Sequence, residues 1–258
     1  MARLELPEHD IVGIRAQNPG PFTLSGTNSW IVGRGPAWLV DPGPALDEHL
    51  AALWDEITRR GDLAGILLTH DHADHAEAVP AMRTSYPGAP LAAARGDVDV
   101  RLSDGDVFGP FEVVATPGHA PDHLAFVTGG VALTGDAVLG EGSVFISPDP
   151  GALVGYLSAL ALLRERPLEV LCPGHGPPVH DPAAKLDGYI AHRLDRERRL
   201  VEALGEGKRS VDDLLDAAWS EVPAPLRPAA AVTLAAHLDK LAAEDRLPTG
   251  VERPSLHI

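Results

Sequence analysis

The stretch Thr69-His70-Asp71-His72-Ala73-Asp74-His75 carries most of the chemistry that this sequence reveals. The apolar residues 63–68 before it predict a buried strand, and residues 73–82 predict the helix after it. The first two histidines are two residues apart, so in an extended segment both project to the same side. Asp74 and His75 lie where the chain bends into the helix, and they approach the same point from another direction.

Imidazole and carboxylate groups are the ligands that Zn²⁺ binds at about 2.0–2.2 Å, so this stretch predicts a metal site. Three further candidate ligands each follow a predicted strand and stand beside Gly, or beside Pro and Gly together: His119, Asp136 and His175. Glycine permits the tight turns and close backbone approach that such a site needs. Together these residues offer enough ligands for two ions.

Predicted strands and helices follow one another along the chain, and the candidate ligands always stand where a strand ends. This order favours an α/β fold in which helices cover two sheets, an αββα sandwich with its site at one edge. The composition changes at residues 205–207. We therefore predict a sandwich domain over residues 1–206 and a mainly helical domain over residues 207–258. Ser210 is the expected N-cap of that domain's first helix, and residues 246–258 predict a short hairpin or a tail.

The composition limits the function and the location of the chain. With 258 residues, 45% hydrophobic and 22% charged, it is typical of a globular protein, and a formal net charge of −16 disfavours nucleic-acid binding through a basic surface. The single cysteine, Cys172, cannot form an internal disulfide, and it is expected to be a small buried hydrophobe in a strand. Residues 1–5 lack an apolar signal core, and no apolar stretch predicts a membrane span. We therefore expect a cytoplasmic protein that does not bind a membrane.

The run His-x-His-x-Asp-His, followed by the three later candidates, resembles the metallo-β-lactamase superfamily in its dinuclear form. This resemblance implies the αββα fold, two Zn²⁺ ions and a metal-bridging hydroxide as nucleophile on an ester, thioester or phosphodiester. It also implies two groups of ligands with a bridging carboxylate, and an orienting, catalytic role for Asp74. The first metal would be held by His70, His72 and His119, the second by Asp74, His75 and His175, and the bridge would be Asp136.

Further motifs along the chain are similar to the β-lactamase-like protein 2 group. They occur at residues 26–28, 39–43, 116–124, 140–142, 173–180 and 189–193, and a small winged-helix-like domain follows. The animal member of this group resembles a single-strand-selective endoribonuclease, and fungal relatives are thioesterases. The partner of the chain therefore stays open between a small-molecule acyl or thioester substrate and single-stranded RNA. The C-terminal domain is expected to serve either in packing between the domains or in forming a homodimer.

Several residues beyond the ligands are weaker candidates for substrate contact. They are Asn28, predicted to lie on a loop, His123, His180 and His192. Asp41, at another strand end, and Asp71 are candidates to hold the tautomers of the ligating histidines. Residues 193–199 contain four arginines that would suit phosphate, but their interleaving with acidic residues is typical of a solvated, ion-paired helix face.

Four other functions are compatible with parts of this sequence. A true zinc β-lactamase is disfavoured, because the best-known members have Cys where this chain has Asp136, and they are exported. A redox di-iron enzyme is disfavoured because it resembles a pattern with Glu in place of His72. A mononuclear iron persulfide dioxygenase and a DNA-binding winged-helix regulator remain as alternatives, although the C-terminal residues show no strong basic stripe.

Overall fold

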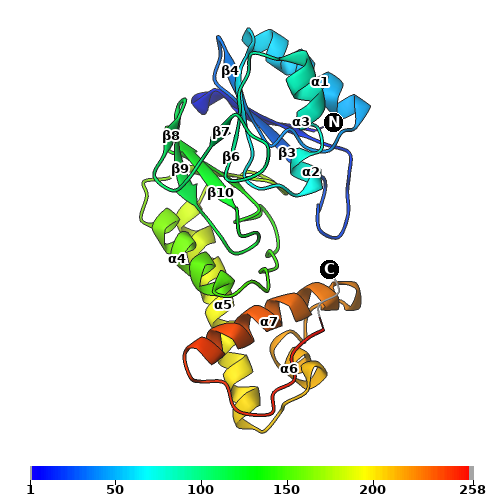
Figure 1. Cartoon of the computed structure of the whole chain (residues 1–258), viewed down its shortest axis with the longest axis vertical. Helices are drawn as coiled ribbons and strands as arrows, with labels where there is room; N and C mark the ends of the chain where they lie inside the picture. Colours follow the sequence, from blue (N-terminus) through cyan, green and yellow to red (C-terminus); the bar gives the residue numbers. More distant parts are fainter. Residues whose placement is uncertain (1, 256–258) are drawn as a thin grey trace.

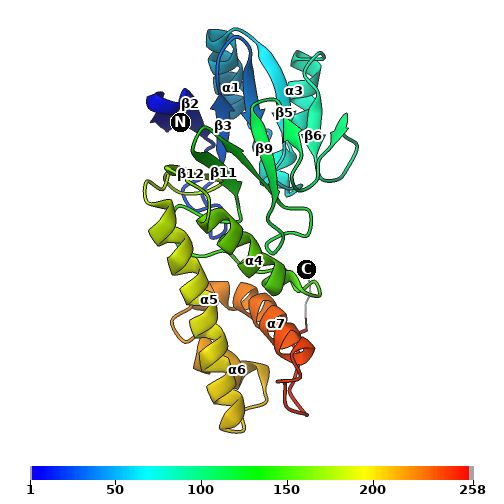
Figure 2. The ribbon, with the colours of Figure 1, turned by 90° about the vertical axis from the view of Figure 1, so that its left-hand side faces the viewer.

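A computed structural model describes residues 2–255, and Figures 1 and 2 show it from two sides. Two β-sheets pack face to face, and helices cover the outer face of each. The helices α6 and α7 form a separate layer at the other end of the molecule, which the long helix α5 reaches from the sandwich (Figure 1). The predicted αββα sandwich with a helical C-terminal domain is therefore confirmed.

The first sheet has seven strands in chain order. The first four pair antiparallel, whereas β5, β6 and β7 each join in parallel. Their bounds are β1 Arg3–Leu6, β2 Ile11–Arg15, β3 Asn28–Val32, β4 Ala37–Val40, β5 Leu63–Leu67, β6 Leu91–Ala93 and β7 Val100–Arg101.

The second sheet has five strands in the order β12-β11-β10-β9-β8. The hairpin β10–β11 turns at two glycines, as its sequence predicts, and β12 pairs in parallel with β11. The bounds are β8 Val107–Phe108, β9 Phe111–Ala115, β10 Leu124–Thr128, β11 Val131–Gly135 and β12 Val170–Pro173. Cys172 lies in β12 and is fully buried, as predicted.

The helices divide between the two outer faces and the C-terminal domain. Their bounds are α1 Asp47–Arg60, α2 Ala73–Ala76, α3 Val79–Ser85, α4 Ala152–Arg164, α5 Pro182–Gly205, α6 Val211–Ala218 and α7 Arg227–Ala243, with short 3₁₀ turns at Pro7–His9 and Ala224–Leu226. Ser210 caps α6, because its side chain accepts a hydrogen bond from the backbone of Asp213.

Four apolar clusters hold these layers together. One lies between the first sheet and α1 and α3, and one, which includes Trp30 and Phe126, lies between the two sheets. The third packs the second sheet against α4 and the first half of α5, around Tyr156. The fourth joins the last turns of α5 to α6 and α7, around Leu234. Helix α5 therefore belongs to both domains, and the predicted boundary after residue 206 remains a prediction.

The predicted helix over residues 73–82 is wrong in one respect, because the structure divides it into α2 and α3. Pro80 has no backbone N–H to donate to the carbonyl of Ala76, so α2 ends at Ala76 and a new helix begins at Val79. Residues 246–255 contain no strand, so the hairpin considered for the end of the chain does not form within the described residues. None of the helices in residues 2–255 combines the length and apolar character that a bilayer span requires.

The two sheets meet at one edge, where strands of both end. Two backbone hydrogen bonds of 2.7 Å join them there, from Leu124 to the carbonyl of Thr69 and from Asn28 to the carbonyl of Gly174. Because β4 and β5 are parallel, and β11 and β12 are parallel, the segments after these four strands emerge side by side. The predicted metal ligands all lie in or beside these segments.

Candidate metal centre

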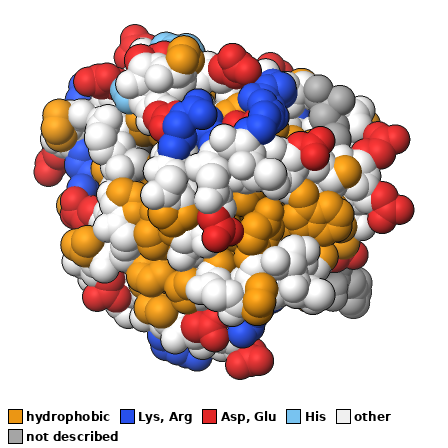
Figure 3. Space-filling model, turned by 90° about the horizontal axis from the view of Figure 1, so that it is seen from above, with side chains coloured by type: hydrophobic (Ala, Val, Ile, Leu, Met, Phe, Trp, Pro, Cys, Tyr) orange, Lys and Arg blue, Asp and Glu red, His pale blue; other side chains and the backbone are white. Residues whose placement is uncertain are grey.

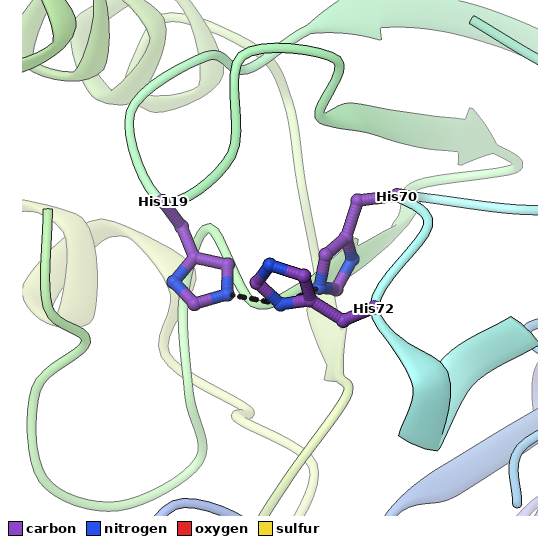
Figure 4. Close-up of side chains that lie close together, drawn as sticks. All are labelled: His70, His72 and His119. Carbon is purple, nitrogen blue, oxygen red and sulfur yellow. Dashed lines mark hydrogen bonds between the residues drawn. The ribbon is translucent and has the colours of Figure 1, made fainter. Parts of the chain in front are cut away.

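His70, His72 and His119 form the first group of converging nitrogens. The first two come from the segment between β5 and α2, and His119 comes from the turn after β9 (Figure 4). Nδ1 of His72 lies 3.0 Å from Nε2 of His70 and 3.0 Å from Nε2 of His119. Nitrogens that share a tetrahedral Zn²⁺ at about 2.0–2.1 Å would lie only slightly farther apart than this. The three lone pairs are thus placed to meet at one point.

Asp74, His75 and His175 form a second group, in which the ligand atoms lie within 4.8 Å of one another. Oδ2 of Asp74 is 3.5 Å from Nε2 of His75 and 3.3 Å from Nε2 of His175. All three side chains come from the ends of strands or from α2, at the edge where the sheets meet.

Asp136, directly after β11, stands between the two groups. Its Oδ2 is 3.6 Å from Nε2 of His119 and 3.3 Å from Nε2 of His175, while its Oδ1 is 3.5 Å from Nε2 of His75. This carboxylate therefore reaches nitrogens of both groups. The structure brings all seven predicted ligands into one cluster.

The outer nitrogens of these rings are held by other groups of the chain. Nδ1 of His75 lies 2.9 Å from Asp41, and Nδ1 of His70 lies 3.0 Å from the hydroxyl of Thr69. His119 and His175 direct their Nδ1 atoms toward backbone carbonyls at 3.3 Å. Such contacts fix the tautomer of a histidine and leave the inner nitrogen free to bind a metal.

The cluster suits a bound cation. Nε2 of His75 and Oδ1 of Asp136 are buried and have no hydrogen-bond partner among the described residues, and such orphaned polar atoms are costly unless a ligand satisfies them. Gly174 leaves room for them, because a Cβ there would lie 2.5 Å from the Asp136 carboxylate and 2.6 Å from the His75 ring. The residues present therefore fit metal ions.

The electrostatics of the cluster agree with this fit. Burial alone would raise the pKa of Asp136, but His75 and His175 outweigh it and hold that pKa well below its usual range. Burial likewise opposes the charged form of His175, yet Asp136 and Asp74 raise the pKa of His175 to about 10. Carboxylates that draw protons onto neighbouring imidazoles create a negative potential, which a divalent cation would neutralise.

The two candidates for holding histidine tautomers differ. Asp41 contacts His75 and accepts hydrogen bonds from the backbone and the hydroxyl of Thr69, both at 2.8 Å. Asp71 instead forms an exposed bidentate ion pair with Arg95, with oxygen–nitrogen distances of 2.7 and 3.0 Å. Asp71 therefore holds no histidine of the cluster.

Of the four weaker candidates for substrate contact, only His192 lines the cavity beside the cluster. Asn28 does not lie on a loop as predicted. It begins β3, and its amide donates to the carbonyls of Pro173 and Gly176. His123 is buried behind His70, with ring centroids 4.8 Å apart. His180 is exposed and lies outside this cavity.

The arginine run of α5 is only partly the solvated face that its composition predicts. Arg198 is exposed, Arg199 is half-buried, and both are ion-paired with Asp195, as expected. Arg193 and Arg196 are buried, at 2% and 4% exposure. Arg193 and Arg196 continue the row of buried residues along α5. The helical spacing of that row is the sequence signal that distinguishes these two arginines from Arg198 and Arg199.

A cavity of about 300 Å³ opens beside the cluster. One side presents the metal-ligand candidates, including His72 and Asp136. Another part of the lining comes from α5, with His192, Arg193 and Arg196, and from the C-terminal domain, which contributes mainly apolar side chains such as Trp219 and Leu226. Sequence reasoning missed this wall, because no local pattern shows that residues 219–233 face the cluster.

Comparison with known sequences decides the family. The model of the Metallo-beta-lactamase superfamily matches residues 22–98 and 80–175, and that of the Beta-lactamase associated winged helix domain matches residues 210–247. The chain belongs to the metallo-β-lactamase superfamily. It is thus a metal-dependent hydrolase of that superfamily with a winged-helix domain at its C-terminal side.

Two relatives show how far the likeness of this metallo-β-lactamase protein extends. A protein of Caenorhabditis elegans, named Beta-lactamase-like protein 2 homolog, is 30% identical over 90% of this chain and 83% of its own length. A protein of Aspergillus chevalieri, named Atrochrysone carboxyl ACP thioesterase, is 32% identical over 83% of this chain and 74% of its own length. The expected likeness to the β-lactamase-like protein 2 group is confirmed.

Solved structures share the fold of this metallo-β-lactamase chain. A β-lactamase domain protein from Burkholderia ambifaria aligns with a TM-score of 0.79 at 21% identity, over 96% of this chain and 91% of that protein. TTHA1623, crystallised in a di-iron-bound form, aligns with a TM-score of 0.54 at 28% identity, over 66% of this chain and 95% of that protein. The fold thus accommodates iron in at least one neighbour.

Proposed function

We propose that this chain is a dinuclear zinc hydrolase that cleaves an ester or thioester. The position of Asp136 carries the proposal, because its carboxylate contacts nitrogens of both ligand groups. When bound, a pair of metal ions would polarise the scissile carbonyl and lower the pKa of a water molecule. Seven ligands in two groups support two ions over the single iron of a persulfide dioxygenase.

Asp74 would orient the attacking water. Its Oδ2 accepts a hydrogen bond of 2.9 Å from the hydroxyl of Thr27, which holds the carboxylate in place. Burial alone would raise the pKa of Asp74, but His175 and His75 outweigh it and lower this pKa to about 2. The carboxylate is therefore ionised at neutral pH and can accept a hydrogen bond from the water.

The wall of the cavity favours an acyl substrate over RNA. A single-stranded nucleic acid needs a basic groove that follows its phosphates, whereas the arginines in the lining of this cavity are the buried Arg193 and Arg196, and the lining residues between 219 and 230 are all apolar. The thioesterase name of the Aspergillus relative supports the same choice. The competing function is cleavage of a phosphodiester in single-stranded RNA, because the animal β-lactamase-like protein 2 resembles an endoribonuclease of that kind.

A metal assay followed by a substrate panel tests the proposal. We expect nearly two zinc ions per chain by mass spectrometry, and hydrolysis of an acyl-CoA or a lactone in preference to nitrocefin and single-stranded RNA. His70→Ala and Asp136→Ala should each lower the rate at least about a thousandfold, because several kcal/mol of transition-state stabilisation are lost. Their circular dichroism should be unchanged.

Asp212→Ala, which removes an exposed carboxylate on α6, is the matched control and should keep full activity. Full activity in either ligand variant would contradict the proposal. So would one iron per chain together with sulfur dioxygenation. RNA cleavage without any acyl hydrolysis would establish the competing function.

A further inference from the structure

Arg193 of α5 is a buried cation that has no anionic partner among the described residues. It is 2% exposed and lines the cavity beside the cluster of candidate metal ligands. Its Nη2 donates to the carbonyl of Val144, and its Nε has no hydrogen-bond partner among the described residues. The guanidinium carbon lies 5.6 Å from the centre of the Tyr156 ring. Within residues 2–255, no carboxylate oxygen comes within 4.0 Å of this guanidinium.

Arg196, one turn later on the same helix, shows what a compensated arginine looks like here. Its two Nη atoms donate to the carbonyl of Ala218, at the end of α6, and to the carboxylate of Glu221. Removing a charge from water without a partner costs several kcal/mol, and an opposite charge with good geometry offsets that cost. Arg196 obtains this compensation from Glu221, whereas no carboxylate within residues 2–255 compensates Arg193.

The surroundings of Arg193 define what could supply the missing charge. The guanidinium shares one cavity with the metal-ligand candidates, and the lining of that cavity includes the apolar side chains Val144, Phe145 and Leu226. A single cation matches a singly charged group, and the planar guanidinium fork matches the two oxygens of a carboxylate. The apolar wall matches a hydrocarbon chain that spans the distance from the cluster to Arg193.

We propose that Arg193 binds a carboxylate at the far end of the substrate's acyl group. The substrate class would then be esters or thioesters of a dicarboxylic acid with an apolar spacer, their reacting carbonyl at the metal cluster and their free carboxylate at Arg193. This assignment rests on the proposed hydrolase function, which it narrows. His192, also in the cavity wall, lies beside this position and offers a further polar contact.

Binding of product-like acids to the metal-loaded protein tests the assignment without catalysis. Calorimetry would compare linear α,ω-dicarboxylates of four to ten carbons with monocarboxylates of equal length. At one length or more we expect at least about tenfold tighter binding of the dicarboxylate, because a charged hydrogen-bonded contact contributes roughly 1.5–3 kcal/mol. Arg193→Met should reduce this preference to within about twofold. Arg198→Met, which removes an exposed arginine of the same helix, should retain it.

Arg193 also holds the backbone at Val144, so three controls separate binding from folding. Metal content must be the same in all variants. Arg193→Lys keeps the cation and should retain part of the preference. Thr233→Val disturbs the same backbone segment from α7. It should weaken the binding of dicarboxylates and monocarboxylates equally, since it leaves the guanidinium in place.

Equal preference in Arg193→Met and in the natural chain, or no preference at any length, would overturn the assignment. Tighter binding of an alkyl phosphate than of the carboxylate of the same length would replace the carboxylate by a phosphate. If the natural chain prefers dicarboxylates but hydrolyses no ester, the Arg193 site stands and the proposed hydrolase function fails. If it hydrolyses simple esters but shows no preference for dicarboxylates, the hydrolase function stands and the Arg193 site fails.

Discussion

At the scale of single residues, Asp41 is the side chain on which the geometry of His75 depends. It stands at the end of β4 with a left-handed φ of 53°, which is uncommon for a residue other than glycine. From there it contacts Nδ1 of His75 and binds the backbone and hydroxyl of Thr69. One carboxylate therefore positions both Thr69, which precedes the first histidine of the motif, and His75, which is its last histidine.

We predict that Asp41→Asn weakens metal binding by about 10–100-fold, because the amide nitrogen cannot accept a hydrogen bond and one contact of the carboxylate is lost. Competition with a chromophoric chelator would measure this affinity. Asp71→Asn, which changes an exposed carboxylate of the same motif, is the control and should bind metal normally. Equal affinities in the two variants would show that Asp41 does not position the cluster.

His237 on α7 is a buried imidazole with no hydrogen bond at either ring nitrogen among the described residues. Its ring centroid lies 5.5 Å from that of Trp219. The charged and titratable groups that face it are Arg193, Arg196, Lys240 and His192. Burial, and then the neighbouring cations, lower the pKa of His237 to about 3. Unfolding therefore lets this residue take up a proton at mildly acidic pH.

Between pH 6 and pH 4 the unfolded chain binds one more proton at His237 than the folded chain, so the free energy of unfolding falls as the pH falls. The expected contribution is up to about 1.4 kcal/mol per pH unit. His237→Leu should remove this contribution and stabilise the protein at pH 5, as measured by urea unfolding. His180→Leu, which removes an exposed imidazole, is the matched control for the loss of a histidine. Identical slopes for His237→Leu and the natural chain would refute the prediction.

At the scale of elements, residues 143–147 connect the C-terminal domain to the cluster of candidate metal ligands. Phe145 presents its carbonyl to Nδ1 of His119 at 3.3 Å. On the other side of this segment, Arg193 of α5 binds the carbonyl of Val144, and the hydroxyl of Thr233 on α7 accepts from the backbone of Ile146 at 3.2 Å. Two helices outside the strand layers thus support the segment that holds a candidate ligand.

Thr233→Val should leave the buried N–H of Ile146 without an acceptor, at a cost of roughly 1–3 kcal/mol. We expect the segment to loosen its hold on His119, so that kcat/KM for the best substrate of the panel falls about tenfold. Thr233→Ser keeps the hydroxyl and should restore most of the rate. If the valine and serine variants have the same kcat/KM, this hydrogen bond does not support the cluster.

At the scale of the whole molecule, the distribution of charge argues against DNA binding by the C-terminal domain. The formal net charge is −16, and residues 208–258 contain six Lys and Arg against eight Asp and Glu. Figure 3 shows the opposite end of the molecule, above α1 and α3, and there too the basic side chains are interspersed with acidic ones. Helices α6 and α7 pack their apolar faces against α5, and α7 and the segment before it line the cavity. The C-terminal domain therefore forms part of the cavity wall in this fold.

We predict no gel shift of random duplex DNA at low salt and micromolar protein, since DNA affinity depends on neutralising phosphates with basic groups. A basic winged-helix protein of known affinity would serve as the positive control. Tight binding that weakens as salt is added would favour the regulator alternative over domain packing.

The sequence by itself identified the candidate metal ligands and most of the elements. His70 to His75 follow an apolar run and precede a helix, and a pattern of that kind is local, so it can be recognised before folding. The break at Pro80 was also encoded locally, through the missing N–H, although the apolar spacing around it concealed the break.

Only the tertiary structure decided how distant segments meet. It placed Asp136 between two groups of nitrogens, brought Thr233 to the segment beside His119, and buried Arg193 without an anion beside the cluster. Each of these facts depends on contacts between residues far apart in the chain, which periodicity and spacing do not contain. Ligand identity is a property of the motif, whereas the shape and charge of the cavity follow from the packing of α5 and α7 against the sandwich.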